Sequence, residues 1–160
     1  LFASAAFAAT NTGTLTVKAN VVAGCQVTTT ATGTTDNATL DFGTVSSLTA
    51  NVDADTTTTG SKSIGVLCNN GTGWSLAADS GAHAAAAQRR MQGPTATDVL
   101  PYNLYKDTTR ATPIVSGPAF ATGTGNGTVQ PVNVYGRIPA GTALPAVGAY
   151  TDVVQLTVTY

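Results

Sequence analysis

The side chains with the clearest catalytic potential in this 160-residue chain lie in one short segment. Asp79, Ser80 and His83, the single histidine of the chain, are the three residue types of a hydrolytic triad. A triad needs nucleophile, base and carboxylate within hydrogen-bond reach, and sequence neighbours on one loop seldom meet that requirement. We therefore interpret the segment as a solvated loop. The sequence predicts a protein that is not an enzyme and has no small-molecule substrate.

Side chains that could hold a metal are few. Asp53 and Asp55 could suggest calcium, but the Thr-rich sequence around them lacks the ligand spacing of a calcium loop, so we interpret them as surface charge. One histidine and two cysteines without a Cys-x-x-Cys motif cannot complete a zinc shell. The glycine-rich stretches 71–73 and 123–127 lack the Lys and Ser/Thr of a phosphate-binding loop. The sequence predicts no metal and no other cofactor.

The two cysteines, Cys25 and Cys68, point to the cellular compartment. Residues 1–8 (LFASAAFA) are similar to the end of a secretory signal that is cleaved after Ala8, with an ordinary apolar leader as the alternative. Export to an oxidising compartment favours a Cys25–Cys68 disulfide, which typically contributes about 2–4 kcal/mol, over two buried free thiols.

Composition restricts the class of protein. Thr, Ala, Gly and Val dominate, Glu is absent, and charged residues make up only 9%. With a net charge of −1 and no stripe of Lys and Arg, the chain has no electrostatic basis for binding nucleic acid or an anionic membrane. Its length predicts one domain with a hydrophobic core, and β-branched residues with Gly and Asn turns favour β-structure.

Strand-like alternation of apolar and polar residues marks both ends of the chain. It places Gly13, Leu15, Val17 and Ala19 on one face near the start, and Val154, Leu156, Val158 and Tyr160 on one face at the end. Further strand candidates are 40–42, 63–68, 74–78, 100–105 and 128–137, and the last candidate is 151–160; only 82–90 has a helical composition.

This spacing of candidates predicts an all-β sandwich. The first strand could pair within its own domain or reach into another. The final strand ends on an apolar residue, so we expect something to hold it in place.

Short motifs along the chain carry a family resemblance. They are Cys25, Leu40-x-Phe42-Gly43, Ile64-x-Val66-x-Cys68, Gly81, Arg90-Met91, Leu100-x-Tyr102-x-Leu104-Tyr105-x-Asp107, Gly136-x-Ile138-Pro139, Gly148-x-Tyr150-x-Asp152 and Val158-x-Tyr160. In this order, from about residue 12 to 160, they resemble the spore coat protein U domain, the pilin module of archaic chaperone–usher pili, including biofilm-associated pilins. The Gly-x-Tyr-x-Asp element before the terminal strand is the most specific marker.

The resemblance implies an incomplete immunoglobulin-like β-sandwich that is completed by a donor strand from a neighbouring subunit. A periplasmic chaperone first fills the groove beside the last strand, and at an outer-membrane usher the N-terminal strand of the next subunit replaces it. Residues 9–20 would then be the donor, with Gly13, Leu15, Val17 and Ala19 facing inward, and 21–160 the pilin domain. The acceptor groove and chaperone contact would include Val154, Leu156, Val158 and Tyr160.

The implied function is a structural one: a homopolymeric surface pilus, exported through the periplasm, that supports adhesion and biofilm formation. The alternatives are a pilus tip or adhesin module and a spore-coat component of the same fold. A secreted β-sandwich enzyme ranks last, because no convincing acid–base pair is present.

Overall fold

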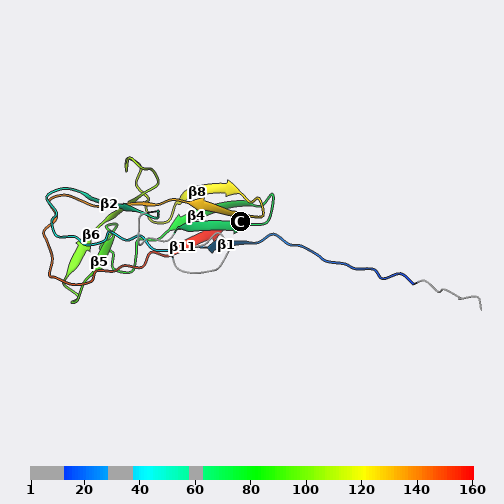
Figure 1. Cartoon of the computed structure of the whole chain (residues 1–160), viewed down its shortest axis with the longest axis horizontal. Helices are drawn as coiled ribbons and strands as arrows, with labels where there is room; N and C mark the ends of the chain where they lie inside the picture. Colours follow the sequence, from blue (N-terminus) through cyan, green and yellow to red (C-terminus); the bar gives the residue numbers. More distant parts are fainter. Residues whose placement is uncertain (1–12, 29–37, 58–62) are drawn as a thin grey trace, which may run out of the picture.

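The computed structural model describes residues 13–28, 38–57 and 63–160 (Figure 1). Within these ranges the regular structure consists of β-strands: β1 (Cys25–Thr28), β2 (Val52–Asp55), β3 (Ile64–Cys68), β4 (Gly73–Ala78), β5 (Arg90–Gln92), β6 (Val99–Pro101), β7 (Asn103–Tyr105), β8 (Ala119–Thr124), β9 (Val129–Val132), β10 (Tyr135–Ile138) and β11 (Leu156–Thr159). The predicted all-β fold is therefore present.

Two three-stranded antiparallel sheets, ordered β1-β3-β9 and β11-β4-β8, form one half of the molecule. Their inner faces supply Val66, Cys68, Trp74 and Leu76 to a common core, because alternate strand residues point to the same side. The strands β1 and β11 contact each other where the two sheets meet (Figure 1). The two sheets are thus layers of one sandwich.

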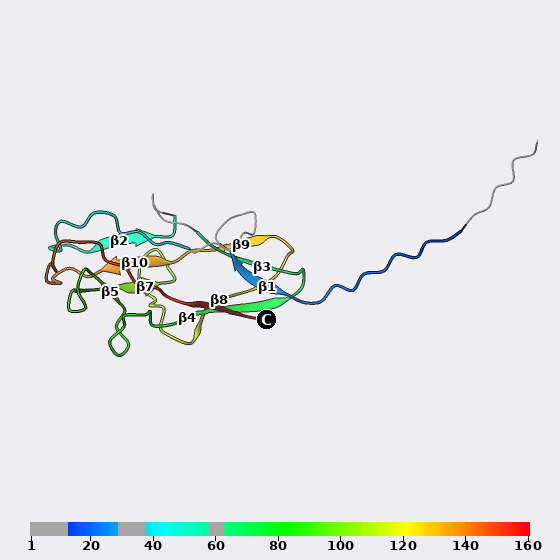
Figure 2. The same cartoon turned by 90° about the horizontal axis from the view of Figure 1, so that it is seen from below.

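The other half of the molecule contains a third sheet, ordered β2-β10-β7, and the β5–β6 hairpin (Figures 1 and 2). The chain passes from β9 to β10 through Val134, whose backbone exchanges hydrogen bonds with Thr56. Ile138 is fully buried and extends the same hydrophobic core into this half.

The predicted disulfide is present. Cys25 and Cys68 are directly opposite each other in the β1–β3 pair, and their sulfur atoms are 2.04 Å apart. The bridge fixes the register of β1 on β3 immediately after the N-terminal segment.

Several strand predictions needed adjustment. The candidates 63–68 and 74–78 correspond to β3 and β4, whereas 100–105 is interrupted at Tyr102 and 128–137 at 133–134. Segment 40–42 is not a strand. The reason is that both edges of β10 are already paired, with β2 and β7. Leu40 and Phe42 therefore contact β10 through their side chains, which lie over Gly136. A Cβ on Gly136 would lie 2.8 Å from the Phe42 ring.

Residues 13–22 follow an extended path away from the body of the molecule (Figure 2). They belong to no strand of the described part of the chain, and all of them are exposed. Strand-like alternation in this segment is therefore not satisfied by pairing with its own domain in the described structure.

Candidate functional site

An apolar pocket of about 380 Å³ opens between the strands next to the C-terminal segment. Its wall from that segment comprises Tyr150, Thr151, Asp152, Val154 and Leu156. Other apolar lining residues come from distant parts of the chain and include Leu40, Phe42, Ile64, Met91, Leu104, Ile114, Phe120 and Val134. The pocket therefore exposes part of the core that the fold would be expected to cover.

The C-terminal segment has alternating burial, as its sequence predicts. Val154, Leu156 and Val158 are half-buried, whereas Val153, Gln155 and Thr157 are exposed. Of the predicted acceptor residues, Val154 and Leu156 line the pocket, and Val158 packs against the core beyond it. Tyr160 is 62% exposed and lies outside the pocket lining.

The backbone of this segment is hydrogen-bonded on the side that faces β4 and the loop after it. The Val153 carbonyl accepts from the Ala82 N–H at 3.0 Å, and the Gln155 carbonyl accepts from the Asp79 N–H at 3.0 Å. The Gln155 N–H donates to Asp79 Oδ1 at 2.9 Å. Because alternate residues of a strand direct their backbone groups to opposite edges, those of Val154 and Leu156 point away from β4.

β11 pairs with β4 and lies at the end of its sheet in the described part of the chain, and β1 lies at the end of the sheet next to it. The outer edge of β11, which β1 contacts, and the apolar pocket are therefore on the same seam of the sandwich. Such a seam can accept an extended segment that forms backbone hydrogen bonds and inserts alternate side chains.

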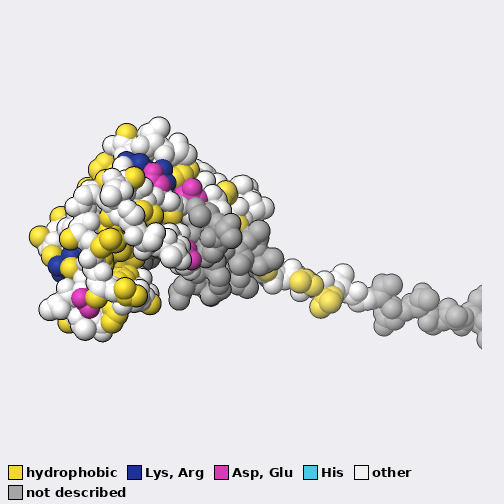
Figure 3. Space-filling model, turned by 60° about the vertical axis from the view of Figure 1, so that its left-hand side comes forward, with side chains coloured by type: hydrophobic (Ala, Val, Ile, Leu, Met, Phe, Trp, Pro, Cys, Tyr) yellow, Lys and Arg dark blue, Asp and Glu magenta, His cyan; other side chains and the backbone are white. Residues whose placement is uncertain are grey.

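The predicted donor residues show complementary properties. Leu15 and Val17 are 89% and 83% exposed, and Gly13 and Ala19 beside them are exposed as well. Figure 3 shows hydrophobic side chains along this extended tail and again in a patch on the body. The structure does not bring the described tail residues 13–22 and the pocket of the same molecule together.

Sequence reasoning missed a buried polar cluster in the pocket wall. The Asp152 side chain is only 2% exposed, and its Oδ2 accepts from the Tyr102 hydroxyl at 2.7 Å. Its Oδ1 accepts from the backbone N–H of His83 and contacts His83 Nδ1, both at 3.1 Å. His83 is thus paired with a carboxylate distant in the sequence, and Asp79 instead binds backbone N–H groups of Gly81 and Gln155.

A signal for this cluster was present in the sequence. Asp152 is an even-numbered residue like Val154 and Leu156, so the two-residue period of a strand places its side chain on the same inward face. Burial and the hydrogen bond to Asp152 raise the pKa of Tyr102 far above its usual range, which keeps the hydroxyl protonated as a donor.

Arg89 supports the loop that carries Asp79 and His83. It is 6% exposed, and its guanidinium donates to the carbonyls of Asp79, at 3.1 Å from Nε, and Ile114, at 2.6 Å from Nη1. Burial lowers the pKa of Arg89. Arg90, which belongs to the Arg90-Met91 motif, is half-buried and donates to the His83 carbonyl at 3.1 Å.

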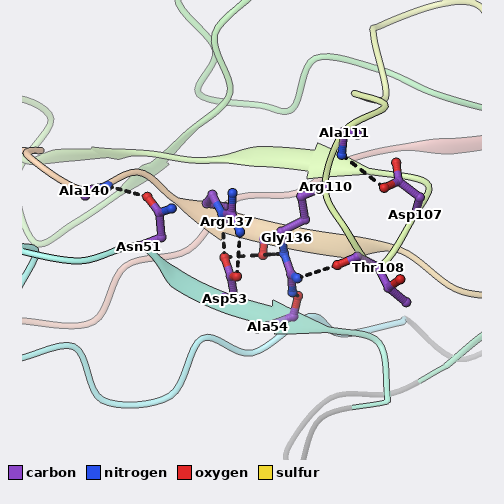
Figure 4. Close-up of polar contacts among 10 residues, drawn as sticks. All are labelled: Asn51, Asp53, Ala54, Asp107, Thr108, Arg110, Ala111, Gly136, Arg137 and Ala140. Atoms are coloured by element: carbon purple, nitrogen blue, oxygen red, sulfur yellow. Dashed lines mark hydrogen bonds and ion pairs between the residues drawn. The ribbon is translucent and has the colours of Figure 1, made fainter.

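Asp53 is exposed, as its interpretation as surface charge predicts, and it is paired at the surface with two arginines. Asp53 accepts two hydrogen bonds from Arg137, each 2.7 Å long, and Arg110 Nε lies 3.4 Å from its Oδ1 (Figure 4). Hydrogen bonding to Arg137 is the main cause that lowers the pKa of Asp53. Arg110 also donates to the carbonyls of Gly136 and Ala54, so the cluster fastens β2 to β10.

Within residues 13–28, 38–57 and 63–160, no group of three His, Cys, Asp or Glu side chains is arranged to hold a metal ion. The same residues contain no helix of the length and hydropathy needed to cross a membrane.

Comparison with known proteins gives consistent matches. The family model of the Spore Coat Protein U domain matches residues 11–157. Protein U of Myxococcus xanthus is 37% identical over 166 residues, an alignment that covers 98% of this chain and 89% of that protein.

Two solved structures are similar. One is a chain of the CsuC–CsuE chaperone–tip adhesion subunit pre-assembly complex, from the archaic chaperone–usher Csu pili of Acinetobacter baumannii, with a TM-score of 0.58 and 19% identity. The match covers 88% of this chain, which spans only 40% of the matched chain. The other is the P pilus rod subunit PapA, with a TM-score of 0.49, 16% identity and coverage of 85% and 98% of the two chains.

The structural match at a TM-score of 0.58 confirms the predicted immunoglobulin-like sandwich. Because the family model covers nearly the whole chain and a relative is 37% identical along it, the chain belongs to the Spore Coat Protein U domain family.

Proposed function

We propose that the chain is a structural subunit of a chaperone–usher pilus and polymerises by donor-strand exchange. In each joint, residues 9–20 of one subunit enter the seam beside β11 of the next. The observation that carries the proposal is the complementarity of two features of one molecule. The tail exposes Leu15 and Val17, and the pocket exposes core side chains next to the outer edge of β11.

The interactions available to such a joint are strong. Burying Leu15 and Val17 would contribute about 1.5–3 kcal/mol each, and each added backbone hydrogen bond about 0.5–1.5 kcal/mol. Leu15 and Val17 share one face with Gly13 and Ala19, so a strand in this register would place all four toward the pocket. Several contacts formed together would make the joint slow to dissociate.

The proposal also assigns the partners. An apolar pocket beside a bare strand edge promotes aggregation, so a subunit needs a temporary occupant before assembly. We assign that role to a periplasmic chaperone, with an outer-membrane usher as the place of exchange and the cell surface as the destination. Val158 and the exposed Tyr160 would contact the chaperone at the end of the seam. Adhesion and biofilm formation would be functions of the finished filament.

A second candidate is a component of a spore coat, favoured by the description of the matching family and by the identity to Protein U. The same strand exchange would operate there, so the two functions differ in cellular context. A tip adhesin of the same fold is the third possibility, and ligand binding by the isolated monomer would favour it.

Hydrogen exchange on a variant that lacks residues 9–20 tests the joint. A synthetic peptide of residues 9–23 should slow exchange at the amides of Val154, Leu156 and Val158 by at least about tenfold, because these would become hydrogen-bonded to the peptide. The amides of Val153 and Gln155 should change little. The variant alone should stay monomeric, whereas the complete chain should polymerise.

A peptide with Leu15→Asp and Val17→Asp provides the control for non-specific binding. Filaments formed by the variant without residues 9–20, or binding of both peptides with no protection of these amides, would contradict the proposal.

A further inference from the structure

The pocket wall changes its chemical character along the C-terminal segment. Leu156 and Val154 are aliphatic, and the next residue of the same parity, Asp152, is a buried carboxylate. Tyr102, its hydrogen-bond partner, also lines the pocket. A segment that enters along this wall therefore meets two apolar positions and then a polar one.

The polar position is tightly built. Asp152 is bonded to Tyr102 on one side and to the His83 loop on the other. A Cβ on Gly81 would lie 2.1 Å from Asp152 Oδ2, so the backbone of this loop packs directly against the carboxylate. The Tyr102 ring is in turn held edge-on to Phe42, with ring centroids 6.4 Å apart. The carboxylate and its donors have little room to move apart.

We propose that Asp152 sets the register of the donor strand, as a specificity-determining residue that rejects a slip by two residues. The inference rests on the proposed donor-strand function. It adds the residue that selects one register among the registers in which the donor strand turns the same face inward.

The need for such a residue follows from the strand period. A slip by one residue turns Thr14 and Thr16 inward, so the apolar pattern itself excludes it. A slip by two keeps the same face inward, and the pattern alone does not exclude it. Only the nature of the individual positions along the groove can separate these frames.

The sequence of the tail matches the wall in one frame. Its inward face reads small, large, large, small, at Gly13, Leu15, Val17 and Ala19. With Leu15 and Val17 beside the aliphatic pair of the wall, a small residue falls at Asp152. That residue is Ala19 for an antiparallel donor and Gly13 for a parallel one.

A slip by two toward Asp152 replaces that small residue with Val17 or Leu15. A branched side chain there would separate the carboxylate from the Tyr102 hydroxyl, and a buried carboxylate that loses a donor is costly. A slip in the opposite direction puts a small residue beside Val154 or Leu156 and forfeits apolar burial. The frame with both large residues on the aliphatic wall is therefore preferred.

Disulfide trapping measures the register directly. The acceptor is the complete chain with Thr157→Cys, an exposed position of β11, and with Leu15→Asp and Val17→Asp, which keep its own tail out of the seam; the donors are peptides of residues 9–23 with the natural Leu15 and Val17. Each peptide carries one cysteine on its outward face, at position 12, 14, 16, 18 or 20. Directly opposed residues have Cβ atoms close enough for a disulfide, whereas those two positions away are about 7–8 Å distant.

The expected product is dominated by one peptide cysteine, position 14 for an antiparallel donor or position 18 for a parallel one. Its yield should exceed that of the neighbouring even positions by about tenfold, which corresponds to about 1.4 kcal/mol. In Tyr102→Phe, which keeps the ring and removes the hydroxyl, and in Asp152→Ala, this preference should fall toward equality. In these variants the yield of the trapped disulfide should rise for the peptide with its cysteine at position 12 if the donor is antiparallel, or at position 20 if it is parallel.

Asp53→Asn is the matched control, because it disrupts a carboxylate network of similar size away from the pocket lining. It should lower the melting temperature and leave the register unchanged, which separates a register effect from general destabilisation. Equal trapping at all positions in the parent chain, dominance of position 16, or an unchanged preference in both variants would overturn the inference while leaving strand donation intact. No binding of any peptide would instead reject the proposed function itself.

Discussion

Trp74 Nε1 donates a hydrogen bond to Gln130 Oε1 at 3.0 Å and so joins β4 of one sheet to β9 of the other. Trp74 is 8% exposed, and its indole packs against Gly123, where a Cβ would lie 2.6 Å from the ring. β8 and β9 are the outer strands on this side of the two sheets, and β11 and β1 on the other. The sandwich is thus tied by these side chains at the β8–β9 edge, whereas β11 and β1 contact each other at the opposite edge.

This closure predicts that Trp74→Phe destabilises the fold without affecting the acceptor seam. Loss of the donor and of part of the ring should lower the free energy of unfolding by about 1–3 kcal/mol in denaturant titrations. Affinity for a peptide of residues 9–23 should be unchanged, because Trp74 does not line the pocket. Gln130→Ala keeps the indole ring of Trp74 and should lower the free energy of unfolding by less. A change of peptide affinity in either variant would show that the two edges of the sandwich are coupled.

The Cys25–Cys68 bridge predicts a redox dependence of stability. Its reduction, or Cys25→Ser with Cys68→Ser, should remove about 2–4 kcal/mol, because β1 would lose its covalent attachment to β3. Thermal unfolding with and without reductant measures this. The serine variant should not respond to reductant, and equal melting temperatures of the oxidised and reduced parent chain would contradict the prediction.

The Asp53–Arg137 pair predicts a loss of stability in acid. The folded state lowers the pKa of Asp53, so its contribution is present above the ordinary value of 3.8 and disappears as the pH falls through the lower folded value. The Asp53 side chain is 35% exposed, so solvent screening limits the effect to about 1 kcal/mol or less. Below pH 3.8 the melting temperature of the parent chain should approach that of Asp53→Asn; a constant difference down to pH 2 would contradict this.

Tyr102 predicts the opposite dependence, in alkali. Its pKa is raised in the folded state, chiefly by burial, so its contribution is complete below the ordinary value of 10.0 and declines as the pH rises above it, where the unfolded chain ionises first. Unfolding free energies measured between pH 9 and 11.5 should therefore fall more steeply for the parent chain than for Tyr102→Phe. Parallel curves would show that Tyr102 is not protected from ionisation.

The alternation of the tail predicts that its two faces differ in importance for assembly. Leu15→Asp with Val17→Asp should abolish polymerisation, because charges would have to enter an apolar pocket. The matched control is Thr14→Asp with Thr16→Asp, which adds the same charges to the outward face and should still assemble. Size-exclusion chromatography with light scattering measures both, and equal effects of the two double variants would exclude a specific inward face.

Local pattern determined much of this protein. The period-two alternation of residues 13–19 and 154–158 identified both halves of the proposed joint, since strand geometry depends only on adjacent residues. The pairing of Cys25 with Cys68 followed from composition and compartment. β3 and β4 were equally clear, because each buries the apolar residues at alternate positions along its length.

Tertiary structure decided the rest. Segment 40–42 has the pattern of a strand, but the edges of β10 were already occupied by β2 and β7. The strands β1, β2, β5 and β8 were missed, because segments with weak alternation become strands only when a neighbour supplies their hydrogen bonds.

The same distinction applies to the polar residues. The sequence placed His83 beside Asp79 and Ser80, whereas the fold pairs it with Asp152, 69 residues away. Tyr102 reaches the same carboxylate across 50 residues. Sequence proximity does not reveal such partners, because a buried carboxylate takes whichever donors the packing of distant strands brings within reach.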